Sequence, residues 1–194
     1  MKPHVSIIIV NWNGAADTLH CLASLQAITY PNYSIILVDN GSRPDDRTAL
    51  QPLHPQVQYI QNERNLGFVG GNNIGINAAL SSATPPDYLL LLNNDTTVAP
   101  DFLEAMVDQA AADSLIAIVG PKILLMDRPT VLQTVGDQLN RQTGRMLSPA
   151  EGRVDTGQYN IPSFPDFVTG ACLLIKTEVV KKIGLLDNAF FAYW

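Results

Sequence analysis

The sequence predicts an α/β fold in which a mostly parallel sheet is covered by helices on both faces. Three observations favour this class. Continuous runs of Ile, Leu and Val alternate with helical stretches along the first 120 residues, as in strands that are buried on both faces. The length of 194 residues fits one α/β domain. Hydrophobic residues make up 46% of the chain and charged residues 15%, so disorder and a long coiled coil fit poorly.

The first third of the chain is expected to hold three strands with helices between them. A run of Val and Ile over residues 5–10 predicts a buried strand. Residues 15–26 carry leucines at helical spacing. A second apolar strand, residues 34–39, ends at an Asn-Gly turn pair, and a short polar helix follows at about residues 45–50. Residues 57–61 form the third predicted strand.

A glycine-rich passage opens the next predicted helix, residues 65–80. The continuous apolar run 88–92 predicts another strand, and it is followed by a helix over residues 100–112 and a strand over residues 116–119. This succession of strands and helices is what a parallel sheet with helical connections requires.

The regular succession stops beyond Pro121. Prolines and Gly-containing pairs indicate loops or short edge strands over the next 45 residues or so. A strand over residues 168–175 and a short helix over residues 177–183 are expected to follow.

Charge and cysteine usage exclude several classes of protein. Lys plus Arg is 12 against 18 for Asp plus Glu, a net charge of −6, so wrapping of nucleic acid is not expected. The apolar run 5–10 is too short for a signal peptide or a membrane span, and no later stretch spans a bilayer. Cys21 and Cys172 lie in no metal or redox motif, so we interpret both as buried, reduced thiols of a cytoplasmic protein.

Polar residues follow four consecutive predicted strands. Ligands of open α/β sheets bind at the carboxyl ends of the strands, so these residues are expected to line one edge. Any one of them alone is typical of an Asx turn or a helix cap, whereas four groups in succession favour a site. The candidates are Asn11, Asn13, Asp39, Asn65, Gly67, Asn72, Asn73, Asn93, Asn94 and Asp95.

Each candidate has a chemical use if the ligand is a nucleotide-activated sugar. Asp39 offers a carboxylate to a base N–H, and the glycine-rich turn brings the backbone and the amide of Asn72 or Asn73 close. Asp95 is the natural ligand for Mg²⁺ or Mn²⁺, which a diphosphate needs in an acidic chain without a phosphate-loop lysine. The glycine spacing fits neither a dinucleotide fingerprint nor a phosphate loop.

The ordered set of motifs resembles the inverting GT-A glycosyltransferases of family 2, specifically their rhamnosyltransferase-like and galactofuranosyltransferase-like bacterial members. The resemblance implies a GT-A fold, with a nucleotide-sugar-binding part over residues 1–125 and an acceptor-side part of the same domain over residues 126–194. The motifs that carry it are Val5–Asn13, Val38–Ser42, Asn65–Phe68 with Gly71–Asn73, Leu92–Thr96, Gly170-Ala171 with Ile175-Lys176, and Gly184–Asp187 with Phe190–Tyr193.

The resemblance also implies roles for individual residues. Asp39 would bind the base, and Asn93-Asn94-Asp95 would stand for the DxD motif, with Asp95 as its sole carboxylate. Gly170 and Ala171 would lie on the acceptor side.

Two features concern the end of the sequence. Members of this family carry their catalytic base in a Glu-Asp pair just after the Phe-Phe-x-Tyr segment, and the sequence stops at Trp194, one residue earlier. We therefore expect a truncated enzyme, in which Asp187 is a weak fallback for the base and is interpreted first as a loop cap. The terminal aromatic cluster, Phe190, Phe191, Tyr193 and Trp194, is expected to fold back over the sheet edge, pack on another chain or stay uncovered.

The function implied by the resemblance is inverting transfer of a sugar from dTDP-rhamnose or a UDP-sugar to a glycan or lipid-linked acceptor in surface polysaccharide synthesis. A divalent cation would be the cofactor. The location would be cytoplasmic, with peripheral association of the full-length enzyme at the inner face of the cell membrane as one option. The alternatives are a non-catalytic nucleotide-sugar-binding module, a nucleotidyltransferase, and a glycosidase that uses Asp39 and Asp95 as its carboxylate pair. The sequence lacks the early glycine-rich loop with a following Arg and Lys that a nucleotidyltransferase would need for a triphosphate.

Overall fold

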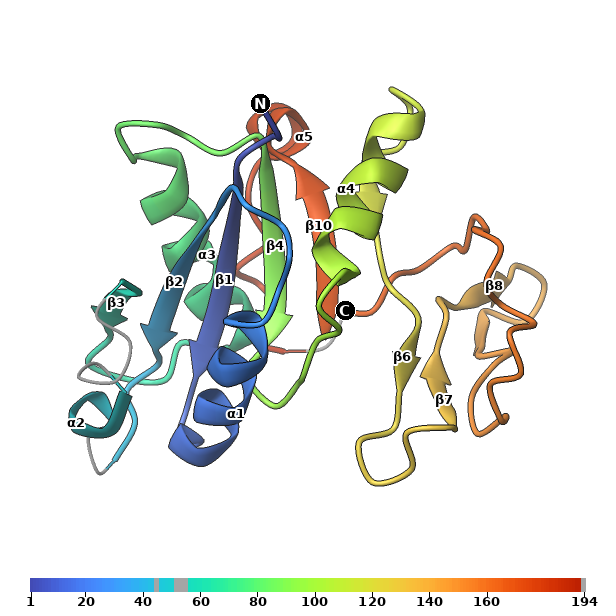
Figure 1. The fold of residues 1–194 in the computed structure, drawn as a ribbon, viewed down its shortest axis with the longest axis horizontal. Helices are drawn as coiled ribbons and strands as arrows, with labels where there is room; N and C mark the ends of the chain where they lie inside the picture. Colours follow the sequence, from blue (N-terminus) through green and yellow to red (C-terminus); the bar gives the residue numbers. More distant parts are fainter. Residues whose placement is uncertain (44–45, 51–55, 193–194) are drawn as a thin grey trace.

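The computed structural model describes residues 1–43, 46–50 and 56–192, and its centre is a six-stranded sheet (Figure 1). The strand order is β3-β2-β1-β4-β10-β5. All neighbours pair in parallel except at β10, which is antiparallel to both β4 and β5. The strands are β1 (Val5–Asn11), β2 (Tyr33–Asp39), β3 (Gln58–Gln61), β4 (Tyr88–Asn93), β5 (Ile118–Val119) and β10 (Cys172–Lys176).

Helices cover both faces of this sheet, as predicted. Successive side chains of a strand point to opposite faces, so Ile7 and Ile9 of β1 join a core with α1 and α4, whereas Ile8 joins a second core with α3 and α5. Because both faces are buried, β1 and β4 have continuous apolar sequences. The helices are α1 (Ala15–Leu25), α2 (Arg47–Leu50), α3 (Gly67–Leu80), α4 (Phe102–Ala112) and α5 (Thr177–Ile183).

The stretch beyond Pro121 forms two small antiparallel pairs beside the main sheet, at the right of Figure 1. Their strands are β6 (Ile123–Leu124), β7 (Leu132–Thr134), β8 (Gln138–Asn140) and β9 (Arg145–Leu147). The chain then returns to the main sheet as β10, between β4 and β5. The two sequence parts proposed above therefore share one sheet, and the division at residue 125 stays a prediction.

Two predicted strands were too long. The predicted strand 116–119 pairs only at Ile118 and Val119, because the backbone of Ile116 closes a turn onto Asp113. The predicted strand 168–175 begins only at Cys172, because Gly170 and Ala171 lie in a turn in which the Ala171 N–H donates to the Thr169 hydroxyl at 3.3 Å.

Both cysteines are buried and free, as expected from their apolar surroundings. Burial in the apolar core raises the pKa of Cys21 and that of Cys172 to about 12. None of the helices in the described part of the chain is both long and apolar enough to cross a bilayer.

Candidate functional site

The parallel register brings three of the predicted polar residues to one edge of the sheet. Asn11 at the end of β1 is opposite Asp39 at the end of β2, and Asn93 at the end of β4 is opposite Val10 of β1. The shared direction of the strands thus places their polar carboxyl ends side by side, as expected for three of the four predicted groups.

Asp39 is the most completely hydrogen-bonded of these residues. It is fully buried. Its Oδ1 accepts from the Gly41 N–H at 3.1 Å, the Ser42 N–H at 2.8 Å and Gln61 Nε2 at 2.9 Å. Its Oδ2 accepts from Asn11 Nδ2 and from the Ser42 hydroxyl, both at 2.7 Å. Because Gln61 is the exposed side chain among these donors, a ligand N–H would reach Asp39 by displacing the Gln61 amide.

Asn11 connects this carboxylate to the end of β4. Its Nδ2 donates to Asp39, and its Oδ1 accepts from the hydroxyl of Thr18 in α1 at 2.9 Å. Asn94 Nδ2 donates to the same Thr18 hydroxyl at 3.0 Å. Asn11 and Thr18 are fully buried, so the network fixes the ends of β1, β2 and β4 relative to one another.

Asn93 and Asp95 lie on either side of the inward-pointing Asn94. The side chain of neither residue forms a hydrogen bond or an ion pair with any described residue. Asp95 is exposed, and Asn93 is partly exposed. The amide and the carboxylate, two residues apart, are therefore available to a ligand at this edge.

The loop after β1 is also held by its polar side chains. Asn13 has φ +54°, a left-handed conformation that asparagine tolerates better than most residues. Its Oδ1 accepts from the Arg43 N–H at 2.7 Å, and its own N–H donates to the Ser42 hydroxyl at 2.8 Å. The exposed loop at Asn13 is thus tied to the loop that follows β2.

The glycine-rich turn before α3 is organised by Asn40 and Asn65. Asn65 Oδ1 accepts from the Gly67 N–H at 2.8 Å and from Asn40 Nδ2 at 2.9 Å. Asn40 Oδ1 accepts from Asn62 Nδ2 and from the Leu66 N–H. The helix itself begins at Gly67, two residues later than predicted, because Asn65 forms this turn.

The two neighbouring asparagines of α3 make different contacts, although both were predicted to approach the ligand. Asn72 Nδ2 donates to the Phe68 carbonyl one turn earlier in the same helix, at 2.8 Å. Asn73 instead bonds to Leu186 and Asn188, more than 110 residues away in sequence.

Gly170 and Ala171 lie beside the same edge. The Asn93 N–H donates to the Ala171 carbonyl at 2.9 Å. A Cβ placed on Gly170 would lie 3.1 Å from the Phe68 ring, which follows directly on Gly67. These contacts bring the residues assigned to the acceptor side next to the ends of β4 and the start of α3.

Asp187 forms the loop cap expected for it. Its Oδ1 accepts from the Ala189 N–H at 2.9 Å, and its carbonyl accepts from the Phe190 N–H. The side chain is exposed. Of the terminal aromatic residues, Phe191 folds back onto Gly67, whereas Tyr193 and Trp194 lie outside the described residues.

The described residues contain no group of three or more His, Cys, Asp or Glu side chains that could hold a metal ion. A single carboxylate such as that of Asp95 could hold Mg²⁺ or Mn²⁺ only with further oxygen ligands from a bound diphosphate and from water.

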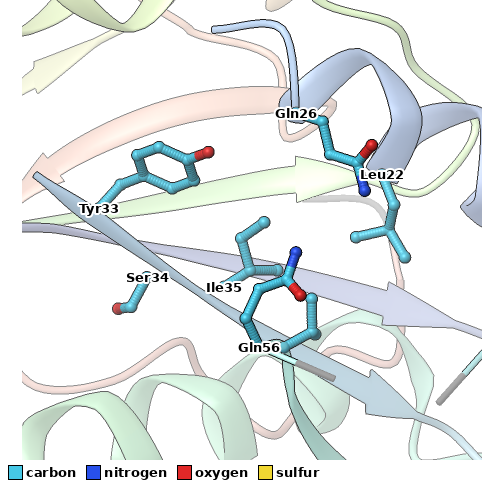
Figure 2. A pocket seen from close by; sticks show the side chains of 7 residues that line it. Leu22, Gln26, Tyr33, Ser34, Ile35 and Gln56 are labelled. Atoms are coloured by element: carbon cyan, nitrogen blue, oxygen red, sulfur yellow. The ribbon is translucent and has the colours of Figure 1, made fainter. Parts of the chain in front are cut away.

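A cavity of about 260 Å³ lies elsewhere, against the first half of β2 (Figure 2). None of the candidate site residues lines it, so it is separate from the carboxyl edge of the sheet. Its lining comprises Leu22, Gln26, Tyr33, Ser34, Ile35, Gln56 and Val57.

Sequence reasoning missed two side chains that organise the edge, Thr18 and Gln61, and it placed Asn40 and Ser42 at the end of the second strand without assigning them a role of their own. Asn40 and Ser42 stand in the motif that contains Asp39, and Thr18 is a polar residue on the otherwise apolar face of its helix. Those two signals were available. Nothing in the sequence distinguishes Gln61 from the other polar residues near it.

A model of the family described as "Glycosyl transferase family 2" matches residues 6–184. The low-salt glycan biosynthesis hexosyltransferase Agl10 of Haloferax volcanii is 26% identical over 100% of this chain and 59% of its own length. An N-acetylglucosaminyl-diphospho-decaprenol L-rhamnosyltransferase of Mycobacterium tuberculosis is 22% identical over 100% of this chain and 68% of its own length. The chain thus spans about six tenths of the first of these relatives.

Two solved structures share the fold. A mannosyltransferase from Pyrobaculum calidifontis, in complex with GDP-Man and Mn²⁺, superposes with a TM-score of 0.64 at 16% identity, covering 97% of this chain and 48% of its own. TarS of S. aureus gives a TM-score of 0.60 at 15% identity, covering 97% of this chain and 53% of its own. These likenesses confirm the predicted GT-A fold.

Proposed function

Because the chain belongs to glycosyl transferase family 2, we propose that its carboxyl sheet edge binds a nucleoside diphosphate sugar and supports inverting transfer of the sugar to a glycan or lipid-linked acceptor. The observation that carries this proposal is the pair of polar side chains, Asn93 and Asp95, that bond to none of the described residues and lie beside a buried hydrogen-bond network. The buried polar groups of the network satisfy one another and fix the ends of the strands. The amide of Asn93 and the carboxylate of Asp95 are therefore held in place beside them, as a binding site requires.

The residues at the edge divide into two roles in this proposal. Asn13, Asn93 and Asp95 are exposed or partly exposed and would contact the donor. Buried Asn11 and Asp39, with Asn65 and Asn94, would hold the loops in place, whereas Asn72 bonds only within its own helix. The base would reach the Asp39 carboxylate only where the Gln61 amide gives way.

Asp95 would hold a divalent cation, Mg²⁺ or Mn²⁺. When bound, the cation would neutralise the negative charge that develops on the leaving diphosphate. The Pyrobaculum mannosyltransferase is in complex with both Mn²⁺ and a nucleotide sugar, which supports a divalent cation as the cofactor of the proposed reaction. Asn93 contributes an amide in place of a second carboxylate, so a single protein charge would hold the cation.

The donor we propose is dTDP-rhamnose or a UDP-sugar, and the product is a surface polysaccharide. The name of the mycobacterial relative supports a rhamnosyl donor, and three further relatives are named for the biosynthesis of a low-salt glycan, succinoglycan and O-antigen. We propose a cytoplasmic location, in which the protein binds its acceptor at the inner face of the cell membrane.

A non-catalytic nucleotide-sugar-binding module is the second candidate. One observation favours it: Asp187, the fallback for the base, uses Oδ1 to hold its own loop. General base catalysis typically contributes about 10²–10⁴-fold, so a chain without a base would bind donor and transfer little.

A transfer assay separates the two candidates. The chain is incubated with Mn²⁺, dTDP-rhamnose or UDP-sugars and a diphospholipid-linked N-acetylglucosamine, and released nucleoside diphosphate and product are measured, with the anomeric configuration read by NMR. Transfer with inversion that is lost in Asp95→Asn and kept in Asp127→Asn, a variant of an exposed carboxylate in the loop between β6 and β7, supports the enzyme. Donor binding without transfer supports the module, and absence of donor binding contradicts both.

A further inference from the structure

The segment that follows α5 turns back onto the start of α3. Gly184 lies at the end of α5 with φ +93°, a conformation that favours glycine and ends the helix. Within the described residues, Leu186 beyond it packs on the core that includes Ile76 and Ala79 of α3, and two parts of α3 make polar or close backbone contacts with this segment. These are the side chain of Asn73 and the backbone around Gly67.

Both the oxygen and the nitrogen of the Asn73 side-chain amide form hydrogen bonds with the backbone of Leu186. Its Oδ1 accepts from the Leu186 N–H at 3.1 Å, and its Nδ2 donates to the Leu186 carbonyl at 2.8 Å. Nδ2 also donates to Asn188 Oδ1 at 3.1 Å. Asn73 is only 5% exposed. An amide used in this way has no Nδ2 proton left for a ligand, because both are already donated.

The second contact explains why residue 67 is glycine. Gly67 has φ +74°, and a Cβ on it would overlap the carbonyl oxygen and the ring of Phe191. The Val69 N–H in the first turn of α3 points to the same carbonyl, at 3.4 Å. The first turn of a helix leaves its N–H groups without helical partners, and here Phe191 supplies one.

We propose that Asn73 is a positioning residue that holds residues 186–191 across the start of α3, and that it sets the acceptor side of the site instead of binding nucleotide. The part of this proposal that concerns the acceptor rests on the proposed function. Gly170 packs on Phe68 at the same place, so the two stretches assigned to the acceptor side both rest on the first turn of α3.

Asn72 supplies a matched control. It is the preceding residue on the same helix, has the same side chain and is 2% exposed, but its amide bonds only within α3. Asn73→Leu removes both bonds to Leu186 at similar volume. Asn73→Asp keeps an acceptor for the Leu186 N–H and replaces the donor with an oxygen, which tests the clamp if the leucine variant folds poorly.

The first measurement is hydrogen exchange at the Leu186 amide, with the Leu90 amide of the buried strand β4 as a reference for global opening. We expect Leu186 to exchange at least about fivefold faster in Asn73→Leu, with a smaller increase in Asn73→Asp, because a hydrogen bond of ordinary strength is lost. In Asn72→Leu, Leu186 exchange relative to Leu90 should stay within about twofold of wild type.

The second measurement separates positioning from nucleotide binding. Titration of UDP, dTDP and GDP with Mn²⁺ should give the same affinity for the Asn73 variants and wild type, and in a transfer assay the KM for acceptor should rise while the KM for donor stays constant. Unchanged Leu186 exchange, or a nucleotide affinity that falls more than threefold in both Asn73 variants, overturns the proposal. If wild-type protein binds no nucleotide, the proposed function fails, and the exchange result alone decides whether Asn73 holds the segment.

Discussion

Replacing Asp39 with alanine should destabilise the protein through the network that its carboxylate holds together. Asn11 Nδ2 keeps two other acceptors, Ser42 Oγ at 3.2 Å and Asp46 Oδ2 at 3.0 Å. The buried N–H and hydroxyl of Ser42 both lose Asp39 as their acceptor. A buried donor left unpaired costs about 1–3 kcal/mol. Because these two donors belong to one residue and their losses overlap, we expect the free energy of unfolding to fall by about 2–4 kcal/mol.

The assay is urea unfolding followed by circular dichroism, with Asp95→Ala as the matched control. Asp95 also follows a strand of the same edge, but it is exposed and bonds to no described residue, so its replacement should change stability by less than about 0.5 kcal/mol. If the two alanine variants are equally stable, Asp39 does not hold the edge together, and the reasoning from its buried hydrogen bonds is refuted.

Two further predictions concern backbone strain and the cysteines. Gly67→Ala should lower the free energy of unfolding in urea by at least about 1 kcal/mol more than Gly152→Ala does. Both residues have φ +74°, but a Cβ on Gly67 would overlap Phe191, whereas nothing lies within 4 Å of a Cβ at Gly152. Equal losses of stability would mean that the Phe191 contact is absent in solution. Cys21 and Cys172 should react with a thiol reagent at pH 8 only after the protein unfolds. Burial raises the pKa of each thiol to about 12, which leaves about one thiolate in 10⁴ at that pH. Rapid labelling of the native protein would contradict this prediction.

The main sheet could be predicted because its strands carry a local signal. Apolar runs in β1 and β4 are continuous, as burial on both faces requires. The insertion of β10 between β4 and β5, antiparallel to both, could not be predicted. Strand order and direction depend on contacts between distant residues, and the composition of a strand does not record its neighbour.

The site, too, could be predicted only in part, because contacts between distant residues decide which polar side chains meet. The polar strand ends were found because they follow apolar runs, and the parallel register then brought Asn11, Asp39 and Asn93 together. The contacts of Asn72 and Asn73 could not be distinguished, because two identical neighbouring residues differ here only in a partner 113 residues away. Likewise, the inward direction of Asn94 depends on Thr18 in α1.

The measurement that tests the central claim most directly is calorimetric titration of a nucleoside diphosphate into the wild-type chain and into Asp95→Asn, with Mn²⁺ and with excess chelator. We predict that UDP or dTDP binds the wild-type chain with Mn²⁺, and that affinity falls at least about tenfold in chelator. In Asp95→Asn the affinity should be equally low under both conditions, because the exposed carboxylate that would hold the cation is gone. Binding by both proteins with equal affinity in chelator would contradict a cation-dependent donor site at this edge.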